Sequence, residues 1–583
     1  MGSETMDVDA LQVGQETKRA FISTSLSVTL ILVFSLTLNL WGNRWGAPDY
    51  WNPDELTKNA IIMFDTRTIK PNTYFYGGLH YYVLAVGAVF PARVYEKAFD
   101  PKPNESDIEI HSKWKERRRI RTICFARSIS ALMTTSQVFL TFLIGNLLFG
   151  ETIGVLAALF LCVSPYLIAV GHFATVDAPA NFWYWLSCFF ALKFWKRKRN
   201  VWLVLACITA GLTFGTKIDR MVILFPLLFA YMKGVGGGEF RKLLKFIPFV
   251  IAGYLLANPS LLFSTIEFLD GTTRDLFFNM IRSDPDATST FTQILAQMKS
   301  GMGVLLFLAA VGGLGYAAWN FLINKDRDGI GWLLSSLVPF YLLIGSHLSY
   351  RWYVPFFFPA LTIFAAYGCQ KIQEVASPNY RMAMRGVPTL IVLTSFLFSL
   401  SLVLQFTNDS RYLVAKWIEE HIPVGASIYI GERGPAISNN KNYLIQPYQD
   451  KADSDREKFD IRRQWRERLD QNKTYLLIRR WILDLEQFTA RISGRPARKE
   501  PYQAWFDYYW GVPKNETVTE RDTVVVKADY IILIDPVDRA KILANMLPDS
   551  GYRVIEKIQY RNPLGIQIPF TFVNPEIYIF AKY

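Results

Sequence analysis

Long apolar runs recur through roughly the first 400 residues and constrain the fold of this chain more than any other feature. Many are roughly 15–25 residues long, and about 20 apolar residues in a helix are enough to cross a bilayer. The chain is therefore predicted to be a polytopic α-helical membrane protein with about eleven transmembrane helices. We place the spans at 21–41, 123–149, 153–171, 180–195, 201–215, 221–233, 246–263, 302–321, 330–346, 352–370 and 387–406.

The end of the apolar runs, at about residue 407, divides the chain into three parts. Residues 1–20 are polar and carry no cleavage signal, so we interpret them as a cytoplasmic tail before a retained first helix. Residues 21–407 form the transmembrane part, with a long first external loop over about 42–122. Residues 408–583 alternate helical and strand patterns and predict an extracytoplasmic mixed α/β domain.

The positive charge is distributed over membrane boundaries. The formal net charge is +13, and basic residues gather in alternate short loops such as Lys196–Arg199. This is the pattern of cytoplasmic loops and argues against a nucleic-acid partner. The apolar segment Leu79–Val94 is interpreted as a helix in the outer interface, because a crossing there would reverse every later loop. The basic segment Lys113–Arg121 then lies outside, either as a solvated helix face or as a helix that meets anionic lipid.

Two acidic motifs follow apolar helices that run outward. YWNPDE carries Asp54 and Glu55 before a segment with helical spacing, and GHFATVDAPANFW carries Asp177. An acid at the start of a helix is often a simple cap, and this alternative stays open for each motif. Ionisable groups at membrane depth are costly and usually functional. Because both motifs are predicted on the same side, we expect Asp54 and Asp177 to share one cavity.

Cationic motifs are predicted at the same face. GLTFGTKIDRM carries Lys217 and Arg220, and SHLSYRWYVPFFFP carries His347 and Arg351. Taken singly, each cation is also explained by a side chain that reaches from a helix end to the interface. Together with the acids, they suit transfer from a lipid phosphate. A carboxylate would act as base on the acceptor, and cations would stabilise the departing phosphate.

In this order the motifs resemble those of a known superfamily. WNPDE, GHFATVDAPANFW, GLTFGTKIDRM and SYRWYVPFFFPAL, spread over about residues 20–370, are similar to stretches of the GT-C superfamily of polyprenyl-phosphate-dependent glycosyltransferases. The sequence most resembles the branch of protein O-mannosyltransferases and aminoarabinose transferases. The resemblance implies an inverting transfer of a sugar from a polyprenyl- or dolichyl-phosphate donor to a protein or glycolipid acceptor, at the non-cytoplasmic face.

The resemblance also implies roles for single residues. Asp54 matches the acid that acts as general base, and Asp177 matches a second acid that positions the acceptor or orients the site. The family often carries Lys-Pro or Pro-Pro where this chain has Gly77 and Gly78, so a cation is missing there and only His80 is nearby. The implied substrate-binding residues are Glu55, His80, Lys217, Arg220, His347 and Arg351.

The sequence assigns no metal site. It has five histidines and neither an HExxH nor a CxxC motif. If a divalent ion binds, Asp54 and Asp177 are its candidate oxygen ligands. The family includes metal-using and metal-free members, so the cofactor is left open.

Two other functions remain as alternatives. A polytopic transporter would also place acids and broken helices in a membrane, although an internal repeat is absent and the charges gather at one face. A non-catalytic GT-C-like scaffold is the second alternative. A multi-pass protein of a prokaryotic plasma membrane is expected, with the endoplasmic reticulum membrane as the alternative.

Overall fold

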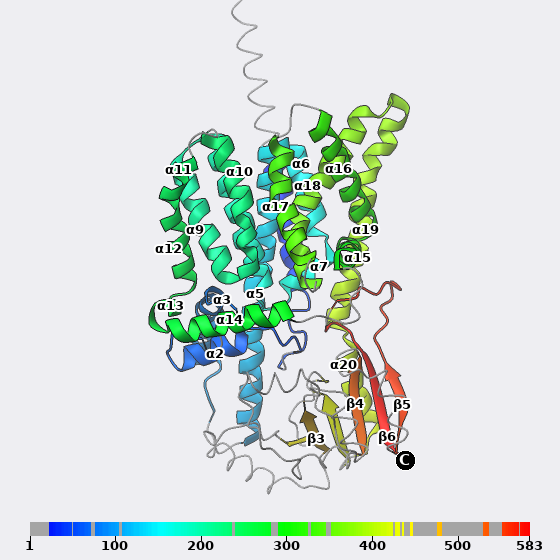
Figure 1. Cartoon of the computed structure of the whole chain (residues 1–583). Helices are drawn as coiled ribbons and strands as arrows, with labels where there is room; N and C mark the ends of the chain where they lie inside the picture. Colours follow the sequence, from blue (N-terminus) through cyan, green and yellow to red (C-terminus); the bar gives the residue numbers. More distant parts are fainter. Residues whose placement is uncertain are drawn as a thin grey trace, which may run out of the picture.

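The computed structural model combines a bundle of helices with a sheet below one end of it (Figure 1). The predicted tail 1–20 and His347 lie outside the residues that it describes. The described residues are 23–48, 51–71, 76–103, 108–235, 240–281, 290–323, 328–345, 351–423, 426–431, 434–435, 443–446, 475–480, 529–535, 551–570 and 572–583.

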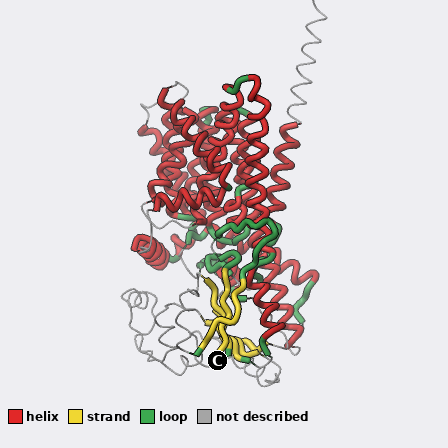
Figure 2. Tube along the Cα trace, turned by 90° about the vertical axis from the view of Figure 1, so that its right-hand side faces the viewer, coloured by secondary structure: helices red, strands yellow, loops and turns green. Residues whose placement is uncertain are grey.

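Long helices that run in a common direction form the bundle (Figure 2). Two helices, α6 (Glu151–Cys162) and α7 (Pro165–Gly171), are bent by 66° at a short break and together form either a broken span or a re-entrant loop. Pro165 explains the break, because proline lacks an N–H group and clashes with the preceding turn. Six other described helices are long and apolar enough to cross a membrane: Ser23–Leu40, Lys113–Phe149, Val304–Ile323, Asp328–Gly345, Arg351–Val375 and Pro378–His421.

The remaining predicted spans also coincide with helices, but these are shorter or less apolar. They are α8 (Asp177–Arg197), α9 (Asn200–Thr216), α10 (Leu224–Val235) and α12 (Ile247–Ala257). In Figure 1, α9, α10 and α12 stand beside the longer helices. The predicted number of eleven spans therefore stays a prediction, whereas a mostly helical protein with six candidate spans is observed.

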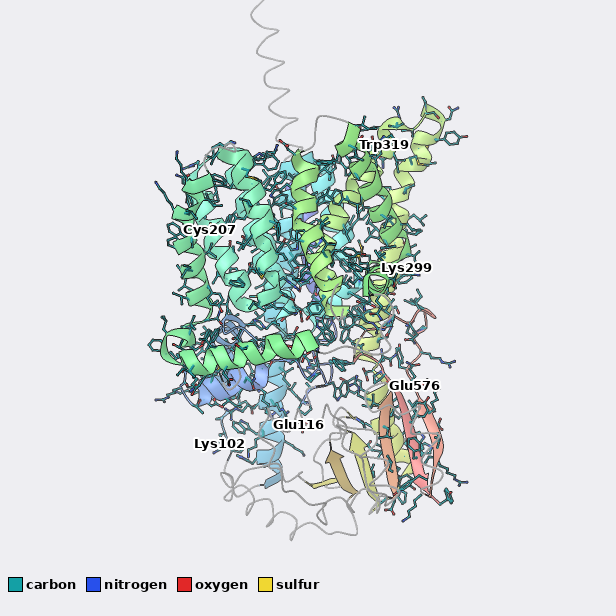
Figure 3. All side chains as sticks on the ribbon, in the orientation of Figure 1. Lys102, Glu116, Cys207, Lys299, Trp319 and Glu576 are labelled. Carbon is teal, nitrogen blue, oxygen red and sulfur yellow. The ribbon has the colours of Figure 1, made fainter. Side chains whose placement is uncertain are left out.

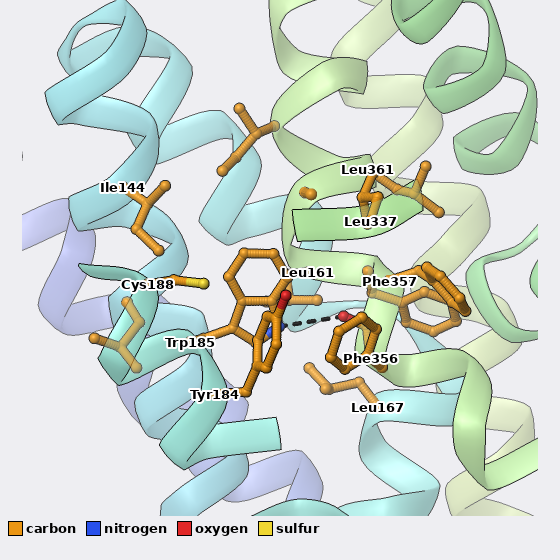
Figure 4. Close-up of a cluster of buried hydrophobic side chains, with 14 of the residues drawn as sticks. Ile144, Leu161, Leu167, Tyr184, Trp185, Cys188, Leu337, Phe356, Phe357 and Leu361 are labelled. Carbon is orange, nitrogen blue, oxygen red and sulfur yellow. Dashed lines mark hydrogen bonds between the residues drawn. The ribbon is translucent and has the colours of Figure 1, made fainter. Parts of the chain in front are cut away.

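Tight packing fills the bundle interior. Figure 4 shows one part of it, where Trp185 of α8 donates from Nε1 to the carbonyl oxygen of Phe356 at 3.2 Å. The ring of Phe356 also packs edge-on against Tyr184, with 4.5 Å between the ring centroids. Phe356 belongs to a 3-10 helix, Arg351–Phe357, that leads into α18 (Phe358–Val375). These contacts join α8 to the turn that carries Arg351. The other long helices are α16 (Val304–Ile323), α17 (Asp328–Gly345) and α19 (Pro378–Thr407).

Several short helices lie at the lower end of the bundle, whereas α11 (Phe240–Leu243) lies at the upper end (Figure 1). The first loop forms α2 (Thr57–Asp65), α3 (Leu79–Leu84) and α4 (Phe90–Phe99), with a π-helical turn between the last two. The segment Leu79–Val94 is thus helical and is not among the candidate spans. One helix that the sequence did not predict, α14 (Thr265–Ile281), runs crosswise below the bundle (Figure 1). The remaining short helices are α11 (Phe240–Leu243), α13 (Ser260–Phe263), α15 (Thr290–Met302) and α20 (Ser410–His421).

The basic segment Lys113–Arg121 is the first part of α5 (Ile108–Phe149). Figure 3 places Glu116 on the part of this helix that projects below the bundle, where the sheet also lies. The arginines here meet acids of the first loop: Arg121 lies 2.8 Å from Asp100, and Arg118 lies 3.0 Å from Glu96. Much of the positive charge is therefore neutralised within the protein.

A six-stranded sheet with the order β2-β3-β1-β4-β6-β5 forms the C-terminal part. The first four strands pair in parallel, and β6 is antiparallel to both β4 and β5. Val414 and Ile418 of α20 share a buried apolar cluster with the inner strands. The predicted extracytoplasmic α/β domain, with its bounds and its side of the membrane, stays a prediction. The strands are β1 (Ser427–Gly431), β2 (Tyr443–Gln446), β3 (Tyr475–Arg480), β4 (Tyr530–Asp535), β5 (Tyr552–Ile558) and β6 (Glu576–Lys582).

Candidate active site

The loops that carry the two acidic motifs lie against each other. The backbone N–H of Leu56 donates to the carbonyl oxygen of Ala174 at 3.0 Å. The N–H of Ala174 in turn donates to the Glu55 carboxylate at 3.2 Å. These bonds bring the segment of Asp54 next to the segment of Asp177, which are far apart in the sequence.

Asp54 lies in the turn that precedes α2 and is half-buried. Its backbone N–H donates to the side chain of Asn52 at 3.0 Å. The residue at the N-cap of α2 is Leu56, and its side chain makes no capping bond. Asp54 therefore lies two residues before the N-cap position, and its role as general base stays a prediction.

Glu55 is held by Arg127 of α5. The guanidinium makes two bonds to the carboxylate, at 2.7 Å from Nε and 3.0 Å from Nη2, and neither side chain is exposed. Arg127 also donates to the carbonyl oxygens of Asn43 and Trp45. Both carboxylate oxygens thus have partners inside the protein. This geometry suits a residue that shapes the first loop, and the predicted contact of Glu55 with substrate stays a prediction.

Asp177 is the first residue of α8 and pairs with Lys217, which follows α9. The Lys217 ammonium lies 2.7 Å from Asp177 Oδ1 and 4.1 Å from the ring centroid of Tyr353. The hydroxyl of Thr175 donates to Asp177 Oδ2 at 3.3 Å. Burial lowers the pKa of Lys217, but the charge of Asp177 and the other nearby anions outweigh it, so this pKa lies above its usual value. Lys217 is therefore cationic at neutral pH.

Arg220 is fully buried beside this pair. Its guanidinium lies 4.3 Å from the ring centroid of Phe340 and donates to Asn181 Oδ1 at 3.2 and 3.3 Å. It also lies 3.0 Å from Asp219. Arg220 thus ties the turn after α9 to α8 and α17. Of the two cations in this motif, Lys217 keeps some exposure and Arg220 keeps none.

Arg351 opens the 3-10 helix that contains Tyr353 and is half-buried. The Tyr353 ring contacts Lys217, so the turn of Arg351 and the Asp177–Lys217 pair meet at this tyrosine. Sequence reasoning did not include Thr175 or Asp219 among the site residues. The only sequence signal for them is their position inside the same motifs.

His80 and the glycines before it have a different environment. Gly78 donates its N–H to Asn258 Oδ1 at 2.7 Å, and a Cβ on Gly77 would lie 1.7 Å from the carbonyl oxygen of Gly215. The glycines therefore permit a backbone contact with the end of α9 that a larger residue would prevent. His80 is fully buried, and neither ring nitrogen has a hydrogen-bond partner among the residues that the structure describes. Such a ring is not placed to hold a phosphate without a rearrangement.

The described residues include no group of three or more His, Cys, Asp or Glu side chains that could hold a metal ion. Asp177 is instead paired with a lysine. Metal dependence stays open.

Residues 121–263 match the family of dolichyl-phosphate-mannose-protein mannosyltransferases. This segment includes Asp177 and Lys217, and the match confirms the resemblance predicted from the sequence. It supports a glycosyltransferase, and together with the apolar helices it supports an integral membrane protein. A comparison with curated proteins found no match.

Several solved structures are similar to this one at low sequence identity. The apo oligosaccharyltransferase of Archaeoglobus fulgidus is 13% identical, with a TM-score of 0.47, over 90% of this chain and 72% of that one. ArnT of Cupriavidus metallidurans, bound to undecaprenyl phosphate, is 12% identical, with a TM-score of 0.47, over 95% of this chain and 97% of that one. The archaeal oligosaccharyltransferase AglB, from Archaeoglobus fulgidus with an inhibitory peptide and a dolichol-phosphate, is 10% identical, with a TM-score of 0.45, over 93% and 73%.

Proposed function

Since residues 121–263 carry a segment of a lipid-phosphate-dependent mannosyltransferase family, we propose that this protein is an inverting glycosyltransferase. It moves a sugar from a polyprenyl- or dolichyl-phosphate donor to a protein or glycolipid acceptor at the non-cytoplasmic face of the membrane. The observation that carries the proposal is that the loop of half-buried Asp54 lies next to the segment of Asp177, whose carboxylate is paired with the Lys217 ammonium. The Asp177–Lys217 pair lies beside the Asp54 loop and shares Tyr353 with the turn of Arg351.

The reaction is a single displacement at the anomeric carbon of the sugar. Asp54 takes the proton from an acceptor hydroxyl, and the hydroxyl oxygen forms the new bond to the anomeric carbon. The bond from that carbon to the phosphate oxygen breaks, and its electron pair leaves with the lipid phosphate. Attack from the opposite side inverts the configuration.

The cations stabilise the leaving group. Negative charge grows on the phosphate as the glycosidic bond breaks, and fixed positive charges in a site that excludes water stabilise it. Lys217 supplies one charge and Arg351 another. Asp177 orients the Lys217 ammonium, and Arg220 fixes the turn that presents it. Glu55 and Arg127 hold the loop of Asp54.

A transfer assay tests the proposal. The purified full chain, in liposomes, is supplied with defined polyprenyl- and dolichyl-phosphate sugars and with candidate acceptors, and the labelled product is identified. We expect one donor class to give a glycosylated product with inverted configuration. Sugar that crosses the bilayer without any glycosylated product would instead favour the transporter. Neither product nor flux with any donor would favour the scaffold.

A further inference from the structure

A buried ion pair lies just after the last apolar helix. Asp409 and Arg411 are at most 1% exposed, and Arg411 Nε lies 2.8 Å from Asp409 Oδ1. A second bond joins Arg411 Nη2 to Asp409 Oδ2 at 3.0 Å. No predicted motif includes these residues, and the reaction above does not use them. A charge pair so deeply buried is stable only when its other hydrogen-bonding capacity is also satisfied.

The first loop supplies some of these partners. The indole of Trp45 donates to Asp409 Oδ2 at 2.9 Å, although the two residues are 364 positions apart. The Arg411 guanidinium lies 3.9 Å from the ring centroid of Trp51. The next residue, Tyr412, accepts a bond from the N–H of Gly46 at 2.9 Å. Trp51 directly precedes the Asn-Pro-Asp turn, so the ion pair contacts the loop that presents Asp54.

The loop between β5 and β6 supplies further partners. The N–H of Asn574 donates to Asp409 Oδ2 at 2.7 Å, and Arg411 donates to the carbonyl oxygen of Phe572. The Phe572 ring stacks on Trp352 with 6.5 Å between the centroids. Trp352 directly follows Arg351. One buried pair is therefore connected to the loop of the proposed base and, through Phe572, to the turn of a proposed phosphate-binding residue.

We propose that Asp409 and Arg411 are positioning residues for sugar transfer. They fix the Asp54 loop relative to the Arg351 turn, so that base and leaving-group cations keep the separation that the reaction needs. This inference rests on the proposed function of Asp54 and Arg351. Reaction rates depend steeply on such geometry, since a displacement of ~1 Å can cost about 100-fold. If the ion pair only stabilised the fold, its disruption would instead lower the stability of the protein and weaken all substrate contacts together.

The main test compares Arg411→Lys with Lys416→Ala, an exposed change on the same helix. Lysine keeps a cation for Asp409 but cannot make the planar, multiply bonded contact of arginine. We expect kcat for transfer to fall about 10- to 100-fold in Arg411→Lys. The donor Kd, measured with undecaprenyl phosphate, should stay within about twofold of that of the parent. Lys416→Ala should match the parent in both quantities.

Amide hydrogen exchange of the full chain gives a readout that needs no activity. In Arg411→Lys, exchange should quicken in peptides that cover 51–56 but not in those that cover α8. If the parent protein has no transfer activity, the proposed function is wrong. Amide hydrogen exchange alone then shows whether the ion pair of Asp409 and Arg411 orders residues 51–56. Unchanged kcat and exchange in Arg411→Lys would overturn the inference. So would a loss of donor affinity as large as the loss of kcat.

A second variant covers the case in which Arg411→Lys does not fold. Trp51→Phe keeps a ring beneath Arg411 but removes the bond from the indole to the carbonyl oxygen of Gly434, which is 2.9 Å long. We expect kcat to fall less than in Arg411→Lys, while the donor Kd again stays close to that of the parent. If kcat and the exchange of residues 51–56 in this variant equal those of the parent, Trp51 does not link the ion pair to the loop of Asp54.

Discussion

The Lys217 ammonium lies 2.7 Å from Asp177 Oδ1 and faces the ring of Tyr353. Both side chains are mostly buried, at 11% and 8% exposure, so the loss of one partner leaves a charge in a site with little water. We expect Lys217→Met to lower both protein stability and donor affinity. Thermal unfolding in detergent and binding of undecaprenyl phosphate measure these two effects separately.

The double variant Asp177→Asn/Lys217→Met separates stability from function. Removing both charges leaves no unpaired ion, so most of the lost stability should return. Transfer should stay low, because neither the phosphate cation nor its orienting acid is present. If the double variant regains parent-like transfer, the pair is only structural and the phosphate is bound elsewhere.

Asp54→Asn should insert and fold normally but transfer sugar poorly. Asparagine has nearly the same shape as aspartate, and Leu56 holds the N-cap position of α2, so we expect the fold to be kept. Loss of a general base typically costs about 10²–10⁴ in rate. We expect kcat to fall within that range, with a parent-like donor Kd. Asp328→Asn, which changes an exposed carboxylate, is the matched control. Near-normal kcat in Asp54→Asn would remove it from the mechanism.

Disruption of the pair formed by Glu55 and Arg127 should cost much stability. Neither side chain is exposed, and removing one partner of a buried pair typically costs ~3–5 kcal/mol. We expect Arg127→Met to unfold at a markedly lower temperature than the parent, and Glu55→Gln/Arg127→Met to recover part of the loss. If Glu55→Gln has normal stability but no longer binds the donor, Glu55 is not mainly structural. That result would support the substrate contact predicted from the sequence.

Local chemistry explains which features the sequence could predict. Apolar length places the helices, because backbone groups in lipid must be bonded within the segment. The contact between the loops of Asp54 and Asp177 followed from placing both motifs at one face. Partners far apart in the chain were not predictable, as the pairs Glu55–Arg127 and Trp45–Asp409 show. Helix α14 was missed because its polar composition gives no apolar run.

Topology can be tested with single cysteines at exposed positions. We expect Lys102→Cys and Lys416→Cys to react with an impermeant thiol reagent from the non-cytoplasmic side. Arg199→Cys, in the basic loop after α8, should react only from the cytoplasmic side. The parent for this test carries Cys124→Ser, because the other cysteines are buried. If Lys102→Cys reacts only from the cytoplasm, the first loop lies on the wrong side to serve a common site with the C-terminal sheet.

Arg351 provides the most direct test of phosphate recognition. Arginine holds a phosphate through two parallel hydrogen bonds, whereas lysine offers a point charge. We therefore expect Arg351→Lys to weaken binding of undecaprenyl phosphate and Arg351→Ala to weaken it further. Folding should change little in either variant, because the side chain is half-buried and Trp352 keeps its contact with Phe572.

Arg381→Ala, an exposed change near the start of α19, controls for a general loss of positive charge. Because Lys217 remains, some affinity for the donor should persist in Arg351→Ala and disappear when Lys217→Met is added. If Arg351→Ala binds the donor and turns it over like the parent, Arg351 is only a helix-end cation at the interface.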